Sequence, residues 1–162
     1  GKFILDKSDF QISELVQNSI AATAQLAEQK GIKIETSFAE QTINADRDRT
    51  FQVIINLLSN AIKFSPESGL IKITTNIEKN WFIIDVSDNG PGLVKGDDEK
   101  VFDPFYRGKT VHNGLINGSG LGLTIVKDIV ETLDGNINLL ASKQGAHFSV
   151  HLPNNNSEPM EI

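Results

Sequence analysis

The sequence contains no cysteine, which excludes a disulfide framework and thiolate chemistry. It has no apolar run near the roughly 20 residues that a membrane-spanning helix needs, and no signal peptide is visible. Positive charge is also scarce, with 15 Lys and Arg against 21 Asp and Glu and a formal net charge of -6. This charge balance argues against general binding to nucleic acids or acidic membranes. An anionic ligand would have to be held by local dipoles, a metal and a few cations.

The remaining composition is that of one globular domain. Of the 162 residues, 39% are hydrophobic and 22% are charged, which is enough for one core of ordinary size. There is no internal repeat and no linker. We expect a single monomeric domain over residues 1–153, followed by a disordered, asparagine-rich tail at 154–162.

Hydrophobic periodicity predicts three helices and several short strands. The helices are expected from Ser8 or Asp9 to about Gly31, from Asp46 to about Phe64, and from Ser119 to Leu133. The strands are expected at 3–5, from residue 32, and at 43–45, 70–77, 81–87, 137–141 and 146–152. This order favours an α+β fold in two layers, with about three helices on one face of a mixed, mostly antiparallel sheet.

A polar stripe marks the second predicted helix. Asn56, Asn60 and Lys63 lie at i, i+4 and i+7, so two amides and an ammonium share one face. An amide oxygen is a hard ligand suited to Mg²⁺, and a lysine can meet a phosphate as a point charge. The pattern indicates a nucleotide site in outline, although a surface helix with scattered polar residues would look the same.

A glycine turn follows the strand expected at 81–87. In Asp88-Asn89-Gly90-Pro91-Gly92, the two glycines let the backbone approach a flat ligand closely. Asp88 can accept a hydrogen bond from an exocyclic amine, the group that distinguishes adenine from guanine. An ordinary hairpin turn is the alternative interpretation of this motif.

A second glycine motif opens the third predicted helix. In Gly118-Ser119-Gly120-Leu121-Gly122-Leu123, backbone N–H groups at a helix N-terminus could bind phosphate. A flexible hinge is the alternative. Gly108-Lys109-Thr110 resembles the end of a P-loop, but that motif needs glycine where Asp103 stands.

The segment between these motifs is long. Loops of this length inside a compact domain are usually functional, and we expect a mobile lid at about 93–117. Three aromatic residues, Phe102, Phe105 and Tyr106, lie within it. They could form a small satellite core or anchor the lid over a ligand, with Arg107 meeting phosphate, and the two roles are compatible.

Four motifs in this order resemble those of sensor histidine kinases. Asn56 to Lys63 resembles their N box, Asp88 to Gly92 their first glycine box, Phe102 to Phe105 their F box, and Gly118 to Leu123 their second glycine box. The resemblance covers nearly the whole chain. It implies a catalytic and ATP-binding domain with the Bergerat fold, which is shared with DNA gyrase, MutL and heat-shock chaperone ATPases.

The resemblance also implies roles for individual residues. Asn60 would coordinate Mg²⁺, Lys63 would contact phosphate, and Asn56 would lie near both, which makes these three the catalytic candidates. Asp88 would bind the adenine amine. The remaining ATP-binding candidates are Phe64, Gly90, Gly92, Phe105, Arg107, Gly118, Ser119, Gly120, Leu121, Gly122 and Leu123.

One matching position bears on the class of reaction, and one position departs from the family pattern. Relatives that hydrolyse ATP with a general base usually carry Glu at the position of Asn56, and an amide cannot act as a base. The site therefore favours transfer over hydrolysis. An ATPase of the gyrase or chaperone type and a serine kinase of the anti-sigma type remain as alternatives. Ala146 stands where many relatives have Ser or Thr, so a second hydrogen bond near adenine is expected to be missing.

The phosphate acceptor is not evident in this chain. His112, His147 and His151 are the three histidines, and none has a helical setting. The resemblance implies that the acceptor histidine lies on a separate dimerisation hairpin and that a response regulator acts downstream. We therefore expect an excised cytoplasmic domain whose parent is either soluble or membrane-anchored.

Overall fold

The computed structural model describes residues 4–38, 40–90, 122–140 and 145–154. Its helices are α1 (Ile12–Gln29), α2 (Arg47–Phe64) and α3 (Gly122–Thr132). Its strands are β1 (Lys7–Gln11), β2 (Lys33–Ser37), β3 (Thr42–Asp46), β4 (Leu70–Glu78), β5 (Trp81–Asp88), β6 (Asn136–Leu140) and β7 (His147–Pro153).

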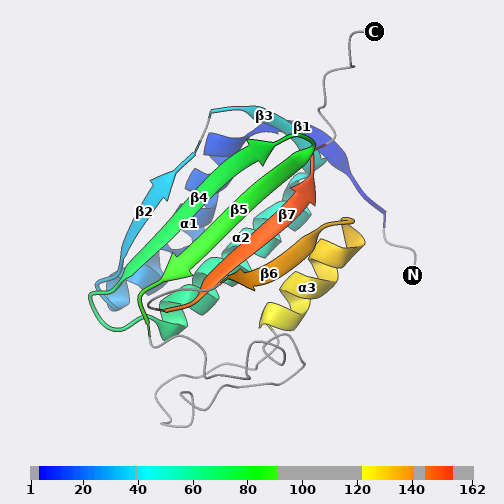
Figure 1. Ribbon diagram of the computed structural model, residues 1–162. Coiled ribbons are helices and arrows are strands. Elements are labelled where there is room, and N and C mark those ends of the chain that lie inside the picture. Colours follow the sequence, from blue (N-terminus) through cyan, green and yellow to red (C-terminus); the bar gives the residue numbers. More distant parts are fainter. Residues whose placement is uncertain (1–3, 39, 91–121, 141–144, 155–162) are drawn as a thin grey trace, which may run out of the picture.

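Five of these strands form one mixed sheet in the order β2-β4-β5-β7-β6. Only the β2–β4 pair is parallel, and the other three pairs are antiparallel. β1 and β3 form a separate antiparallel ribbon. The three helices lie on one face of the large sheet (Figure 1), so the predicted two-layer α+β fold is confirmed.

The core lies between the helices and the three central strands. Alternate residues of each strand point toward the helices, as the pleat requires. The buried apolar strand residues on the helix-facing side are Ile71, Ile73, Phe82, Ile84, Val86, Phe148, Val150 and Leu152, and the buried apolar residues of α2 are Val53, Ile54, Leu57, Leu58, Ala61 and Ile62. In the part of the chain that the structure describes, no helix has both the length and the apolar character to cross a bilayer.

The start of the chain corrects one prediction. Ser8 and Asp9, expected to cap the first helix, lie inside β1, and the helix begins four residues after Ser8 at Ile12. The strand expected at 3–5 is displaced to 7–11. The cause is pairing with β3, which places Phe10 opposite Ile43 and buries both side chains. This long-range pairing outweighs the local capping signal.

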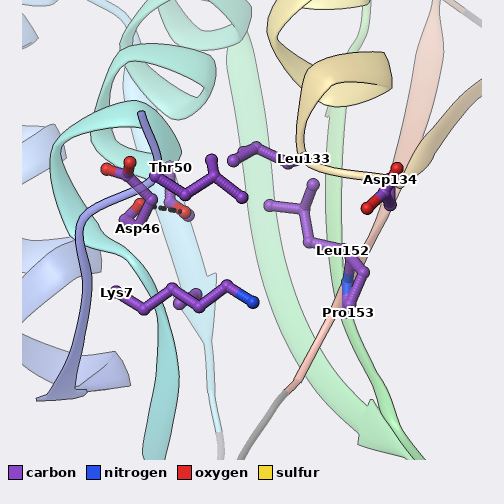
Figure 2. A pocket seen from close by; sticks show the side chains of 9 residues that line it. Lys7, Asp46, Thr50, Leu133, Asp134, Leu152 and Pro153 are labelled. Atoms are coloured by element: carbon purple, nitrogen blue, oxygen red, sulfur yellow. Dashed lines mark hydrogen bonds between the residues drawn. The ribbon is translucent and has the colours of Figure 1, made fainter. Parts of the chain in front are cut away.

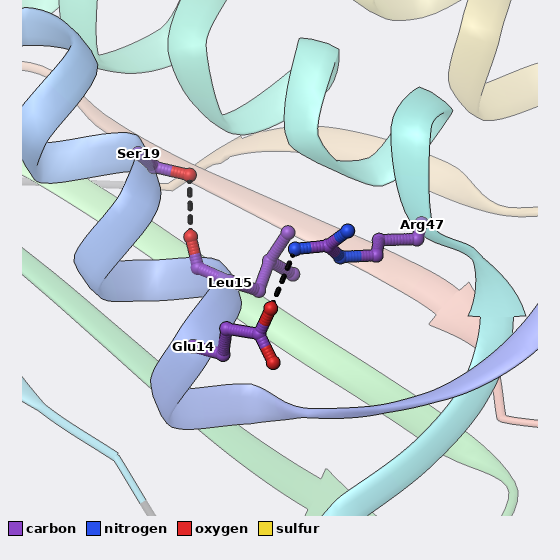
Figure 3. A network of polar contacts seen from close by, with 4 residues as sticks. All are labelled: Glu14, Leu15, Ser19 and Arg47. Carbon is purple, nitrogen blue, oxygen red and sulfur yellow. Dashed lines mark hydrogen bonds and ion pairs between the residues drawn. The ribbon is translucent and has the colours of Figure 1, made fainter.

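The first two helices are joined by packing and by one ion pair. The α1 residues Ser19, Thr23 and Ala27 are buried, and their small side chains allow close approach. The Ser19 hydroxyl donates to the Leu15 carbonyl at 2.8 Å, so its burial leaves no unsatisfied donor. Figure 3 shows this bond beside the Arg47 guanidinium, which donates to the Glu14 carboxylate at 2.7 Å and links α2 to α1.

The end of the described chain gives a second correction. Asn154 was expected to begin the disordered tail, but it is buried. Its N–H donates to the Asn80 carbonyl at 2.7 Å, and its side-chain oxygen accepts from the Asn44 N–H at 3.3 Å. These bonds tie the residue after β7 to the β4–β5 turn and to β3. Residues 155–162 lie outside the described residues.

Asp46, where the sequence predicts the start of the second helix, is its N-cap, and the structure allows a quantitative test. Its carboxylate accepts from the Arg49 N–H and from the Asp6 N–H, both at 3.1 Å. Asp46→Ala removes both bonds at a buried position, so we expect the free energy of unfolding to fall by about 1–2 kcal/mol. Urea denaturation measures it. Asp48→Ala, an exposed position in the same helical turn, is the control and should change stability much less. Equal effects for the two variants would contradict the capping role.

Candidate nucleotide-binding site

Three segments meet at one end of the domain. They are the C-terminal half of α2, the turn that follows β5, and the beginning of α3 (Figure 1). α2 packs against both α3 and β5. The candidate residues of the N box and the first glycine box are therefore brought together, although they are separated by more than 20 residues in the sequence.

The polar stripe on α2 forms as its spacing predicts. Asn56 and Asn60 are half-buried at the edge of the buried face, and Lys63 is exposed. The Asn56 amide N–H₂ donates to the Gln52 carbonyl at 2.9 Å, which leaves its amide oxygen directed away from that bond. No described residue hydrogen-bonds the Asn60 side chain. Two amide oxygens and one ammonium are thus available to a ligand along this helix.

Asp88 is a buried carboxylate at the end of β5, with only 9% of its surface exposed. One oxygen, Oδ1, accepts from the Gly90 N–H at 2.9 Å and from the Ala146 N–H at 3.3 Å. Burial raises the pKa of the Asp88 carboxyl, and these two N–H groups oppose the rise. Among the described residues none donates to the other oxygen, Oδ2. The carboxylate is therefore fixed on one side and open to a donor on the other.

Two glycines make room around this carboxylate. A Cβ at Gly90 would overlap the backbone oxygen of Phe64, the last residue of α2. Gly145 has a φ of +75°, and a Cβ there would overlap the Asp88 carbonyl. The turn after β5 therefore packs directly on the end of α2 on one side and on the start of β7 on the other.

Two residues of this region were not among the predicted site residues. The Asn89 side-chain oxygen accepts from the Leu70 N–H at 3.0 Å and so ties the glycine turn to β4. Ala146 contributes through its backbone, because its carbonyl also accepts from the Asp88 N–H at 3.0 Å. The side chain that Ala146 lacks is thus not needed to hold Asp88. Asn89 lies inside the predicted turn Asp88-Asn89-Gly90, so its position was already marked in the sequence. The family resemblance pointed to the side chain of Ala146, but no local pattern indicated that its backbone would hold Asp88.

The second glycine motif is described only in its last two residues. Leu123 is buried in the core and anchors α3. A Cβ at Gly122 would meet no described atom within 4 Å, so packing among the described residues does not require a glycine there. The other candidates and the predicted lid lie outside the described residues, namely Gly92, Phe105, Arg107, Gly118, Ser119, Gly120, Leu121 and residues 93–117.

A separate hollow lies at the opposite end of α2 and is not this site. Figure 2 shows it between Lys7, Asp46, Thr50 and the ends of α3 and β7, and its volume is about 60 Å³. Ligand pockets for molecules of nucleotide size measure roughly 300–1,000 Å³, so this hollow is too small. Within the described residues no three His, Asp or Glu side chains gather as metal ligands. A metal would therefore have to be held by amide oxygens together with a ligand's own phosphates.

The two described histidines lie on β7, not on a helix. His147 places Nε2 3.0 Å from an Asp85 carboxylate oxygen, and the His151 ring meets Trp81 edge to face with centroids 6.2 Å apart. Both are half-buried on the sheet face that the helices do not cover. The expectation that neither has a helical acceptor setting is confirmed, and His112 lies outside the described residues.

Comparisons with known proteins agree with this architecture. Residues 45–156 match the family described as histidine kinase-, DNA gyrase B-, and HSP90-like ATPase. The chain is 32% identical over 163 residues to the autoinducer 2 sensor kinase/phosphatase LuxQ of Vibrio parahaemolyticus, covering 94% of this chain and 19% of LuxQ. The chain thus spans about a fifth of the length of that relative.

Solved structures give the same result. The catalytic domain of histidine kinase ThkA superposes with a TM-score of 0.79 at 28% identity, covering 92% of this chain and 96% of that one. ThkA has also been solved in complex with the response regulator protein TrrA, covering 93% of this chain and 42% of that one with a TM-score of 0.78. Full-length ShkA in complex with AMPPNP superposes with a TM-score of 0.84 at 27% identity, covering 99% of this chain and 34% of that one.

The family match covers residues 45–156, which is most of the chain, and the fold is that of a solved histidine kinase catalytic domain. The chain therefore belongs to the family of histidine kinase-, DNA gyrase B- and HSP90-like ATPases, as an ATP-binding catalytic domain of the sensor histidine kinase type.

Proposed function

We propose that this domain binds Mg·ATP between Asp88 and α2, and that it supports transfer of the γ-phosphoryl group to a histidine on a separate helical hairpin of its parent protein. The observation that carries the proposal is the Asp88 carboxylate. It is buried and fixed through Oδ1, no described residue donates to its Oδ2, and the turn that holds it packs on the end of α2. A charged acceptor held in this way matches the exocyclic amine of adenine.

The adenine end of the site depends on sheet geometry. The N–H groups of Gly90 and Ala146 hold Asp88 in one orientation before any ligand arrives. Guanine presents a carbonyl oxygen where adenine presents its amine, so it would set two acceptors against each other and leave both unsatisfied. Preference for adenine over guanine follows from this arrangement.

The phosphate end depends on helix geometry. The amide oxygens of Asn56 and Asn60 are hard, neutral ligands that fit Mg²⁺, with Asn60 as the metal ligand, and the Lys63 ammonium fits a phosphate oxygen. Bound Mg²⁺ would neutralise charge on the phosphates. The helix itself orients the three side chains, and positioning with charge neutralisation accounts for most of catalysis in phosphoryl transfer.

The site supports transfer rather than hydrolysis. Asn56 cannot act as a base, and its amide is already bonded to the Gln52 carbonyl. The part of α2 that follows Asp48 contains no Asp or Glu, so the helix offers no carboxylate to activate a water molecule. These residues therefore favour transfer of the phosphoryl group to a protein acceptor over transfer to water.

The acceptor and the downstream partner follow from the relatives. ThkA is a histidine kinase solved with a response regulator. By analogy we infer that the parent of this domain carries a dimerisation hairpin with the acceptor histidine and serves a response regulator, and that the domain works in the cytoplasm.

Nucleotide preference tests the adenine assignment. We expect isothermal titration calorimetry to show Mg·ATP binding well above Mg·GTP binding. Asp88→Asn should weaken ATP binding by about 1–3 kcal/mol, because its amide N–H₂ would meet the adenine amine donor to donor.

We expect Asp88→Asn to lower the affinity for ATP without lowering the stability of the fold. Because the folded-state pKa of Asp88 is raised above its unfolded value, its contribution to stability falls as pH rises through the interval between the two. The asparagine oxygen can still accept from Gly90 and Ala146, and the buried charge is gone. Without nucleotide, the variant should be at least as stable as wild type at neutral pH. Asp85→Asn, on the opposite face of β5, is the control for binding. Equal affinity for ATP and GTP would refute the assignment.

The metal role of Asn60 has its own test. Asn60→Ala removes one oxygen ligand, so we expect the parent kinase to lose autophosphorylation while the domain stays folded by circular dichroism. Asn18→Ala, the same change at an exposed position of α1, should leave the rate unchanged. Autophosphorylation of the Asn60 variant at the wild-type rate would show that Asn60 does not hold the metal.

Phosphotransfer in trans tests the proposed acceptor. With radiolabelled ATP, the isolated chain should not label itself. Mixed with the parent's hairpin as a second polypeptide, it should label the hairpin slowly, since separation loses an effective concentration typically on the order of millimolar. Acid-labile, base-stable label on this chain alone would mean that one of its own histidines is the acceptor.

A further inference from the structure

The C-terminus of α2 is capped by a residue from another element. The helix ends at Phe64 because Ser65 is extended (φ -73°, ψ 146°) and precedes Pro66. Among the described residues, the only backbone partner of the last four carbonyls is the Ser65 N–H, which donates to the Ala61 carbonyl at 2.9 Å. The Lys30 ammonium reaches this end and donates to the carbonyls of Ile62 at 2.8 Å, Lys63 at 3.2 Å and Ser65 at 2.5 Å.

All three donors of the Lys30 ammonium are used by these carbonyls. A cation at the negative end of a helix is also favourable. Burial lowers the pKa of Lys30, while the Glu67 carboxylate acts in the opposite direction. The charged form is thus held at this end against a desolvation cost by three carbonyl oxygens and a nearby carboxylate.

The backbone of Lys30 is fixed as firmly as its side chain. Its N–H donates to the Ala27 carbonyl at 3.2 Å at the end of α1, and its carbonyl accepts from the Ser68 N–H at 2.7 Å. The next residue, Gly31, has a φ of +65°, which lets the chain turn toward β2. Lys30 therefore connects the end of α1 to both the last turn of α2 and the loop that follows it.

This last turn of α2 separates the two halves of the candidate site. Lys63 belongs to the phosphate end, and the Phe64 carbonyl is in close contact with Gly90 of the adenine end. Asp88 is held by the N–H groups of Gly90 and Ala146 and not by Lys30. Without the contacts of Lys30, Asp88 would stay in place, but Lys63 and the last turn of α2 could move relative to Asp88.

We propose that Lys30 is a positioning residue for the nucleotide site: it latches the end of α2 and so fixes the phosphate-binding side chains relative to Asp88. This inference rests on the proposed function. A residue that merely contributes to overall stability would affect all ligands alike. A latch between the two ends affects ligands that span both ends more than ligands that occupy one.

The experiment compares Lys30→Met with Lys33→Met in the full 162-residue chain. Methionine keeps the length of the stem and removes the charge and the donors. Lys33 is a matched control, because its side chain is exposed and forms only a 3.6 Å ion pair with Glu35. Affinities for Mg·ATP and for adenosine are measured by titration, together with amide hydrogen exchange of the nucleotide-free chain.

Lys30→Met should weaken Mg·ATP binding by about tenfold and change adenosine binding by no more than about twofold. Exchange should accelerate at the Ser65 amide and stay unchanged at the Asp88 amide, which bonds Ala146. Lys33→Met should match wild type. If Lys30→Met does not fold, Lys30→Gln is used in its place, because its amide keeps two donors near the carbonyls. We again expect a larger loss of affinity for Mg·ATP than for adenosine.

Equal losses for ATP and adenosine, or unchanged exchange at Ser65, would overturn the positioning role while leaving the proposed function intact. A wild-type chain that binds adenosine but not Mg·ATP, or neither, would instead overturn the proposed function and the nucleotide part of this inference with it.

Discussion

The burial of one face of α2 determines where everything else in the domain can lie. This helix sits between α1 and α3 and over the central strand β5, and its apolar face is fully removed from water. Burial of large aliphatic side chains is worth roughly 1.5–3 kcal/mol each, so the rotation of the helix about its axis is not free to change. The polar stripe of Asn56, Asn60 and Lys63 is therefore directed by the core, and no ligand is needed to orient it.

Asp88 and Lys30, one negative and one positive, are both charged groups that burial destabilises and the backbone stabilises. Asp88 and Lys30 are both shifted toward their neutral forms by burial. Each is held charged by the backbone, Asp88 by N–H groups from a turn and a strand, and Lys30 by carbonyls from a helix end. Such pairs of desolvated charges lower stability locally and are typical of functional regions.

Local signals predicted much of this arrangement. Helical periodicity predicted the polar stripe of α2, and the start of the helix at Asp46 could be predicted because the capping bond to Arg49 spans only three residues. Features that depend on distant partners were missed. The sequence indicated only that the first helix ends near Gly31, and the contacts of Lys30 with carbonyls more than 30 residues away have no sequence signature. β1 was mistaken for the start of a helix because its pairing with β3 is equally remote.

The order of strands leaves β2 and β6 at the two edges of the large sheet, and both are only five residues long. β2 also carries Lys33 and Glu35 on its exposed surface. Short, charged edge strands discourage the addition of a strand from a second molecule, which is the usual route from a folded sheet to aggregation. Two copies of a domain built in this way can be brought close together without adhering to each other through their sheet edges.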